Sequence, residues 1–195
     1  MKVKLAILLA SVIAVGATLM TPWQRSKDTA LVELVAKLDG QWVGRRAPSF
    51  DLPDLAGKQH SHTEYAQKVI FLNIWASFCE PCRKEMPSME RLVRKYNDRG
   101  LVMLAISVDP EAQDAQGFMQ AFLSGQQSTM TVLHDPTAQT AAIYGTELLP
   151  ETYIIDRNGR IVARFVNAYD WSRPEVEELI EHLLAEQGVT SRPLL

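Results

Sequence analysis

The sequence predicts an α/β domain with a mixed central sheet that has helices on both faces. Residues 69–75 and 101–108 form nearly continuous apolar runs, which are typical of strands covered on both sides. A segment with helical periodicity follows each run. Residues 152–156 and 160–166 flank an Asn-Gly pair, a strong hairpin signal. Parallel βα units that end in an antiparallel hairpin imply this mixed architecture.

The other elements follow from local signals in chain order. Alternating polarity before a Gly-Lys turn predicts a small hairpin over residues 48–58. A helix is expected over residues 80–98, with Gly100 ending it and Pro87 kinking it. A helix, a strand and a second helix are then expected at residues 111–123, 130–134 and 137–144. In the last helix, Ser172, Pro174 and Glu175 predict a capping box.

The N-terminal segment differs from the rest of the chain. Two early lysines precede residues 5–20, which carry no charge. This pattern predicts an uncleaved membrane anchor or a cleaved secretory signal, with the following domain exported, and a buried core helix is the third alternative. We therefore expect an anchor or signal over residues 1–23 and a connector over 24–43. The connector's helix, at residues 30–38, would act as a spacer before a folded domain over residues 44–190.

Composition limits the function classes. The chain has 195 residues, of which 47% are hydrophobic and 22% charged, as in one soluble domain with an appendage. Its formal net charge is −3, so nothing favours binding to nucleic acid. No cofactor is expected.

The chain has only two cysteines, Cys79 and Cys82, and they lie between a predicted buried strand and a predicted helix. In an oxidising compartment such a pair can form a disulfide. A bridge across so short a loop does little to constrain the unfolded chain, so a chemical role is favoured over a structural one. A helix N-terminus stabilises a thiolate. We expect an exposed Cys79 to be the nucleophile and Cys82 the resolving thiol.

Two alternatives for the cysteine pair stay open: a passive disulfide and half of a zinc site. Zinc would need two more ligands. Strand alternation is expected to place His60 and His62 on one face of the first hairpin. The strand–Cys-x-x-Cys–helix context favours redox chemistry, and no metal site is predicted.

The segment around the two cysteines resembles a known family. Residues 75–82 read Trp-Ala-Ser-Phe-Cys-Glu-Pro-Cys, which is similar to the active site of the thioredoxin superfamily. Within it, the chain most resembles the membrane-anchored TlpA/ResA/CcmG (DsbE) type of thiol–disulfide oxidoreductase, over about residues 44–187. Further matching segments are residues 47–50, 54–58, 72–75 and 149–156. The resemblance implies a thioredoxin fold with an N-terminal β-hairpin and a central insert near residues 109–135.

The resemblance also implies residues that meet the client protein. Pro150 matches the family's cis-proline, which faces the redox pair and keeps metals away from the thiols. The backbone of Leu149 is then expected to pair with an extended client segment. Glu151 and Trp75 are expected to complete this substrate-binding surface.

Two positions depart from thioredoxin or from the family pattern. Asn73 stands where thioredoxin has a buried aspartate, so proton transfer at Cys82 needs another group. Glu85 shares a helix face with Cys82 and is the first candidate base, with Glu151 the second. Either carboxylate could instead be an exposed charge. Phe78 replaces the tryptophan that commonly precedes the first cysteine.

The resemblance implies a function outside the cytoplasm. The expected protein reduces disulfides in exported clients, for example apocytochrome c, and receives electrons from a membrane thiol–disulfide donor. It would work in the periplasm or at the outer face of the cytoplasmic membrane. A peroxiredoxin is an alternative, although Ala76 stands where that class typically has threonine. A copper carrier is another, with His134 as the histidine nearest the site.

Overall fold

The computed structural model describes residues 22–186. The predicted anchor or signal, residues 1–23, lies outside this range except for its last two positions. No helix within the described residues is both long and apolar enough to span a bilayer.

A five-stranded mixed sheet forms the centre of the domain, in the order β5-β4-β3-β6-β7. β3 pairs in parallel with β4, and β4 with β5, whereas β6 is antiparallel to both β3 and β7. This is the predicted sheet of parallel βα units followed by a hairpin. The strands are β3 (Val69–Trp75), β4 (Leu101–Ser107), β5 (Thr131–His134), β6 (Glu151–Ile155) and β7 (Ile161–Val166).

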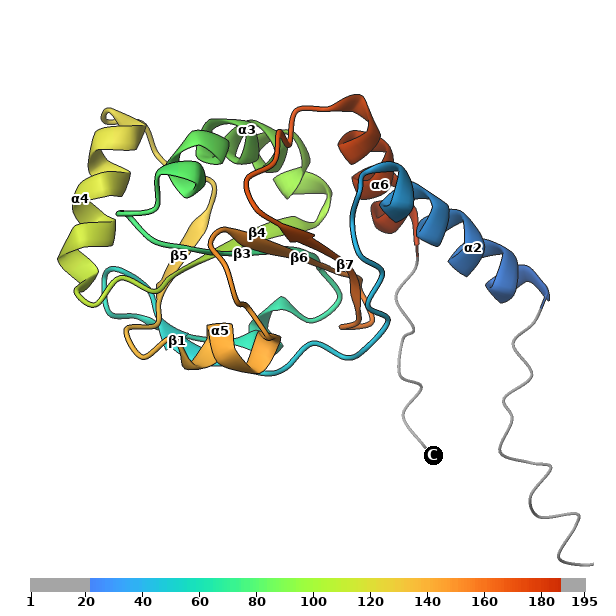
Figure 1. The fold of residues 1–195 in the computed structure, drawn as a ribbon, viewed down its shortest axis with the longest axis horizontal. Coiled ribbons are helices and arrows are strands. Elements are labelled where there is room, and N and C mark those ends of the chain that lie inside the picture. Colours follow the sequence, from blue (N-terminus) through green and yellow to red (C-terminus); the bar gives the residue numbers. More distant parts are fainter. Residues whose placement is uncertain (1–21, 187–195) are drawn as a thin grey trace, which may run out of the picture.

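Helices cover both faces of the sheet (Figure 1). One face carries α3, α4 and α6, and the opposite face carries α5 and the small hairpin β1–β2. Their bounds are α3 (Glu80–Tyr96), α4 (Ala112–Leu123), α5 (Gln139–Tyr144), α6 (Pro174–Ala185), β1 (Asp51–Pro53) and β2 (Gln59–Ser61). α3 continues through Pro87, so the kink expected there stays a prediction.

Strand alternation divides the core between the two faces. Along β3, Phe71 and Trp75 belong to the cluster under α3 and α6, while Leu72 and Ile74 belong to the cluster under α5. Every residue of β3 is buried. This explains why the strand is a continuous apolar run interrupted only by Asn73.

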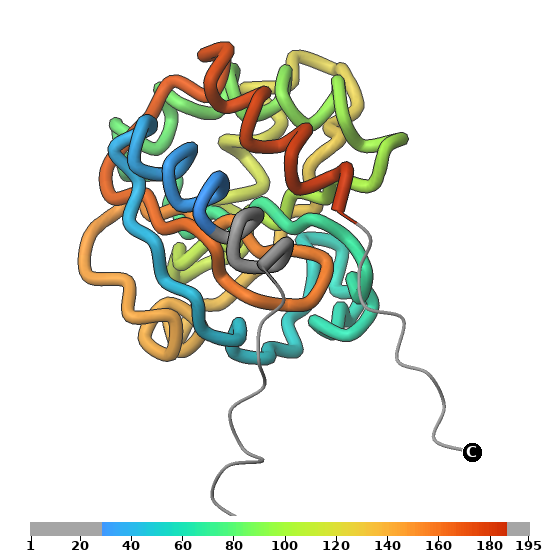
Figure 2. Tube along the Cα trace, turned by 90° about the vertical axis from the view of Figure 1, so that its right-hand side faces the viewer, coloured from blue at the N-terminus to red at the C-terminus, as the bar shows by residue number. Residues whose placement is uncertain are grey.

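The N-terminal helix α2 (Pro22–Lys37) is not the spacer that we expected. It packs beside α6, as Figure 2 shows, and its Leu31 and Val35 are buried in the main core together with the following Leu38. Lys37 Nζ also lies 3.1 Å from a Glu178 carboxylate oxygen. The physical reason is the apolar stripe of the helix, which the sheet domain covers.

The capping box expected at the start of α6 is wrong. The N-cap is Arg173, and its side chain makes no capping bond. A residue before proline is pushed out of the helical region, so Pro174 fixes the helix start one residue later than expected. Ser172 Oγ instead donates to Asp170, at 2.6 Å.

The β6–β7 hairpin forms at the Asn-Gly pair as expected, and Gly159 has a positive φ of 73° in its turn. The first hairpin differs from expectation. In the first hairpin β2 ends at Ser61, and His62 begins a 3₁₀ turn. We had expected strand alternation to place His60 and His62 on one face. Because the strand ends before His62, that expectation is wrong.

Candidate active site

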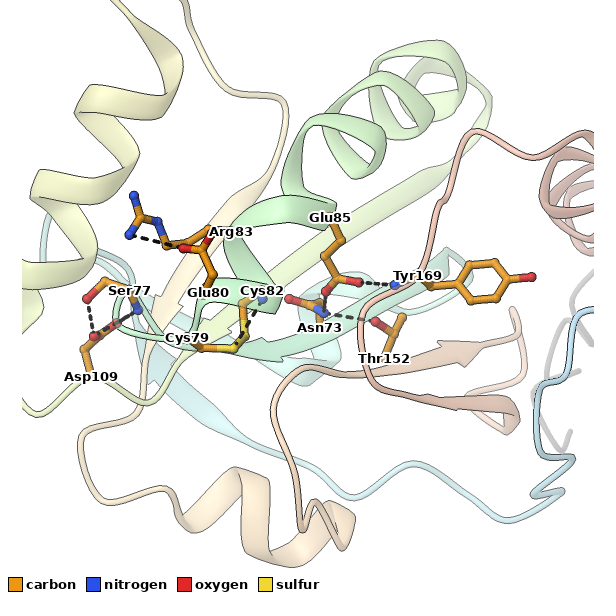
Figure 3. Close-up of a disulfide and its surroundings, with 10 residues drawn as sticks. All are labelled: Asn73, Ser77, Cys79, Glu80, Cys82, Arg83, Glu85, Asp109, Thr152 and Tyr169. Atoms are coloured by element: carbon orange, nitrogen blue, oxygen red, sulfur yellow. Dashed lines mark hydrogen bonds and ion pairs between the residues drawn. A yellow bond between two sulfur atoms is a disulfide. The ribbon is translucent and has the colours of Figure 1, made fainter.

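Cys79 and Cys82 form a disulfide at the start of α3 (Figure 3). Cys79 is the N-cap residue, and its sulfur accepts a hydrogen bond from the Cys82 amide at 3.2 Å. Pro81 occupies the first turn, where its missing amide costs no hydrogen bond. Cys82 is fully buried, and Cys79 is only 9% exposed rather than the open residue that we expected. In the disulfide form, therefore, only a small part of Cys79 is accessible to solvent.

Asp109 fixes the loop that leads into the disulfide. Its buried carboxylate accepts hydrogen bonds from the Ser77 amide at 3.0 Å and the Ser77 hydroxyl at 2.6 Å. The Ser107 hydroxyl donates at 2.7 Å. This role of Asp109 was not predicted from the sequence. Its signal was an aspartate just after β4, at the sheet edge where neighbouring parallel strands also end.

Glu85 is buried beneath α3, so the alternative of an exposed charge is wrong. Its carboxylate accepts hydrogen bonds from Asn73 Nδ2 at 2.9 Å, the Tyr169 amide at 3.0 Å and Trp171 Nε1 at 3.0 Å. Burial raises the pKa of Glu85 from 4.5 to about 7, although these three hydrogen bonds act in the opposite direction. A carboxyl group with this pKa can take up and release a proton near neutral pH.

The Glu85 site has a route to solvent. A surface hollow of about 290 Å³ is lined by Glu85, Ser88 and the 168–170 segment, with Lys84 and Arg91 at its sides. Asp170 from the same segment also faces the hollow. A proton held by the carboxyl group therefore has a short path to water.

Glu151, the second candidate base, lies on the opposite face of the sheet. It is followed by Thr152, which bonds to Asn73 on the α3 side, and by Tyr153, which packs in the α5 cluster. Arg164 donates to both carboxylate oxygens of Glu151, at 2.8 and 3.0 Å, and the Tyr153 hydroxyl donates at 2.6 Å.

These contacts remove the proposed base role from Glu151. Burial alone would raise the pKa of Glu151, but the bonds from Arg164 and Tyr153 outweigh it and lower the pKa. An ionised carboxylate held by Arg164 under the far face of the sheet is a structural charge. It is not a proton acceptor for Cys82.

The predicted client-binding residues have unequal access. Trp75 is fully buried against Phe118, so its expected contact with a client is not available in this disulfide form. The Leu149–Pro150 bond is cis, as expected, and Leu149 is half-buried. Glu151 pairs with Ile74 of β3, so the preceding Pro150 lies at the end of β3 from which the chain runs to Cys79.

Two large apolar side chains near these segments are exposed. Phe78, directly before Cys79, is 70% exposed, and Leu148, two residues before Pro150, is 57% exposed. The exposure of Leu148 was not predicted, because an isolated leucine in a loop carries no sequence signal of exposure.

Metal ligands do not gather at this site. Among residues 22–186, no three histidine, cysteine, aspartate or glutamate side chains are placed to hold an ion. His134 Nε2 lies 2.8 Å from the Asp109 carbonyl oxygen, so this ring nitrogen already has a hydrogen-bond partner. His60 is engaged with Asp54 and Tyr65 in the first hairpin.

Comparison with known proteins agrees with this geometry. Residues 43–164 match the model of the AhpC/TSA family. The thiol-disulfide oxidoreductase ResA of Geobacillus kaustophilus is 34% identical over 156 residues, which cover 80% of this chain and 81% of that protein. The ResA of Geobacillus thermodenitrificans is 37% identical over 119 residues, covering 61% and 66% respectively.

A solved structure extends the similarity to three dimensions. A Chlorobium tepidum protein, provisionally assigned as the thiol:disulfide interchange protein DsbE, superimposes with a TM-score of 0.64 at 32% identity. The alignment covers 72% of this chain and 96% of that one. The chain therefore belongs to the AhpC/TSA family, among its thioredoxin-fold, ResA-type thiol–disulfide oxidoreductases.

Proposed function

We propose that this protein reduces disulfides in exported client proteins, with Cys79 as the nucleophile and Cys82 as the resolving thiol. The observation that carries the proposal is the arrangement at the start of α3, where the 9% exposed Cys79 and the fully buried Cys82 are bridged one turn above a buried carboxyl group. The relatives named ResA support the same chemistry.

The reaction proceeds by two disulfide exchanges. The Cys79 thiolate, stabilised by the amides at the start of α3, attacks a client disulfide and releases one client thiolate. Cys82 then attacks the Cys79 sulfur, breaks the mixed disulfide and releases the second client thiolate. The client gains two electrons and two protons, and the protein is left with the Cys79–Cys82 bond. A dithiol donor at the membrane restores the reduced form by the reverse exchange.

Glu85 is the group that supports the second exchange. Cys82 must lose its proton before it can attack, and it lies in the core, away from water. Glu85 lies three residues further along the same helix face, within reach of Cys82 directly or through one bridging group. Its access to the surface hollow lets it pass the proton to solvent.

The proposed location is the outer face of the cytoplasmic membrane or the periplasm. The uncharged run at residues 5–20, preceded by lysines, supports an N-terminal anchor or signal in residues 1–23. We assign the redox domain to residues 44–190, with residues 24–43 as a connector that also packs on it. Clients would be proteins with oxidised cysteine pairs, such as the haem-binding thiols of apocytochrome c.

The test uses the full chain in detergent micelles and a disulfide-bridged Cys-x-x-Cys-His peptide as client. With a dithiol to recycle the protein, we expect catalysed peptide reduction in the wild type and none in Cys79→Ala. Catalysis by Cys79→Ala equal to that of the wild type would overturn the proposal. The exposed Glu80→Gln variant, in the same helix turn, is the matched control.

A further inference from the structure

The buried Asn73 side chain has one polar atom without a partner. Its Nδ2 donates to Glu85 and to Thr152 Oγ1, both at 2.9 Å, but its Oδ1 has no hydrogen-bond partner. Asn73 is fully buried. Nearly all buried side-chain oxygens in proteins are hydrogen-bonded, so an orphaned one calls for an explanation.

The orientation of the Asn73 amide follows from its neighbours. The Glu85 carboxylate already accepts two hydrogen bonds on its other oxygen, from the Tyr169 amide and Trp171 Nε1. Above about pH 7, where Glu85 is ionised, its carboxylate can only accept, so the group that Asn73 points at Glu85 is its NH₂. The oxygen of the amide is therefore directed away from Glu85.

The unpartnered oxygen lies on the face of the sheet that carries the redox pair. Glu85 and Cys82 are three residues apart on α3, a spacing that brings their β-carbons to about 5–6 Å. Asn73 contacts Glu85 from β3, on the same sheet face as the core cluster that contains Cys82. Figure 3 draws the Asn73 amide between Cys82 and Glu85. In the disulfide form, the Cys82 sulfur has no hydrogen to donate to this oxygen.

We propose that the Cys82 thiol of the reduced protein donates a hydrogen bond to Asn73 Oδ1, so that Asn73 links Cys82 to Glu85. The inference rests on the proposed function, because the donor exists only after the disulfide is reduced. In that step, a dithiol donor supplies two electrons, the S–S bond breaks, and the buried sulfur keeps a proton. The donor leaves as a disulfide.

This arrangement stabilises the reduced form relative to the oxidised form. Reduction gives Oδ1 its missing donor, and oxidation leaves it unpaired in the core. Asn73→Ala removes both the hydrogen bond of the reduced form and the unpaired oxygen of the oxidised form. The thiol–disulfide equilibrium with glutathione should therefore shift about tenfold toward the disulfide. For a two-electron couple this shift equals about 30 mV. Asn73 is thus a positioning residue whose effect is visible in the redox equilibrium.

Asn73→Asp provides the rescue. Two carboxyl groups in one buried site share a proton, because they cannot both ionise at close range. At pH 8 one shared proton remains on the pair, and the introduced aspartic acid, when it holds that proton, would donate to Glu85 and keep an oxygen for Cys82. The equilibrium constant of Asn73→Asp should then stay within about twofold of the wild type at this pH.

The experiment measures the thiol–disulfide equilibrium of the full chain against glutathione at pH 8, where Glu85 is ionised, with alkylated thiols counted by mass spectrometry. Thr140→Ala removes a buried polar side chain in α5, on the far side of the sheet, and controls for a general loss of packing. We expect a tenfold shift in Asn73→Ala and none in Thr140→Ala. Equal constants for Asn73→Ala and the wild type, or failure of Asn73→Asp to rescue, would overturn the inference.

A second measurement applies if Asn73→Ala does not fold. Cys82→Ser carries a hydroxyl that can donate a hydrogen bond to Asn73 Oδ1, whereas the side chain of Cys82→Ala has no donor. With Asn73 intact, Cys82→Ser should unfold at a higher urea concentration than Cys82→Ala, and equal midpoints contradict the inference. Neither measurement uses a client, so failure of client reduction would count against the proposed function alone.

Discussion

Replacing Glu85 with glutamine should remove a large pH dependence from the stability of the protein. The pKa of Glu85 is about 7 in the folded chain, against an ordinary value of 4.5. Each pKa unit corresponds to about 1.36 kcal/mol, so ionising Glu85 in place costs about 3 kcal/mol. Because this side chain is almost completely buried, solvent screening does not reduce that cost much.

The sign follows from where the proton is held. Between pH 4.5 and 7 the native state keeps a proton on Glu85 that the unfolded chain has released. The stability linked to this group is therefore complete below about pH 4.5 and is lost as the pH rises through about 7. Glutamine does not titrate. Its oxygen can still accept from Tyr169 and Trp171, while its amide donates to a rotated Asn73.

The assay is urea unfolding of the oxidised wild type and Glu85→Gln at pH 4.5 and pH 8. The free energy of unfolding of the wild type, relative to the variant, should fall by about 3 kcal/mol between these two values. A change below about 0.5 kcal/mol, which is no more than an ordinary surface substitution produces, would refute the assignment of a raised pKa to Glu85.

Five further variants have expected outcomes. Cys79→Ala should abolish client reduction, and Cys82→Ala should accumulate mixed disulfides that mass spectrometry detects; normal turnover by Cys82→Ala would reverse the assigned roles. Asp109→Ala should lower the free energy of unfolding in urea by at least about 2 kcal/mol, because the Ser77 amide and hydroxyl lose their acceptor. Leu38→Ala should cost about 2–5 kcal/mol, because this side chain is fully buried; a cost below about 0.5 kcal/mol would show that the chain at the end of α2 does not pack on the domain. The lowered pKa of Glu151 contributes stability above about pH 4.5 that is lost as the pH falls, so Glu151→Gln should flatten the acid limb of the stability profile.

The sheet was predictable because its signals are local. The apolar run of β3 and the turn at Gly159 each lie within a few residues, and the expected strands match the observed ones closely. The start of α6 was missed for an equally local reason, the effect of Pro174 on Arg173. The packing of α2 on α6 was missed because it joins segments that lie at opposite ends of the described chain.

The site was predictable only in part. The spacing of Cys79 and Cys82 predicts a redox pair. The apolar strand before them predicts their position at the start of a helix. The burial of Glu85 does not, because Tyr169 and Trp171 are brought to it from more than 80 residues away. The inward and outward directions of Glu151 and Thr152 follow from strand alternation, which would have separated Glu151 from the redox pair.

The reduction potential of the Cys79–Cys82 pair tests the central claim most directly. The full chain in detergent is equilibrated with thiol buffers at pH 7, and its alkylated thiols are counted by mass spectrometry. A protein that reduces exported clients should have a potential near or below about −220 mV, toward the thioredoxin end of the scale. A potential near about −120 mV, as in a strong oxidant, would contradict the proposal by reversing the direction of electron flow.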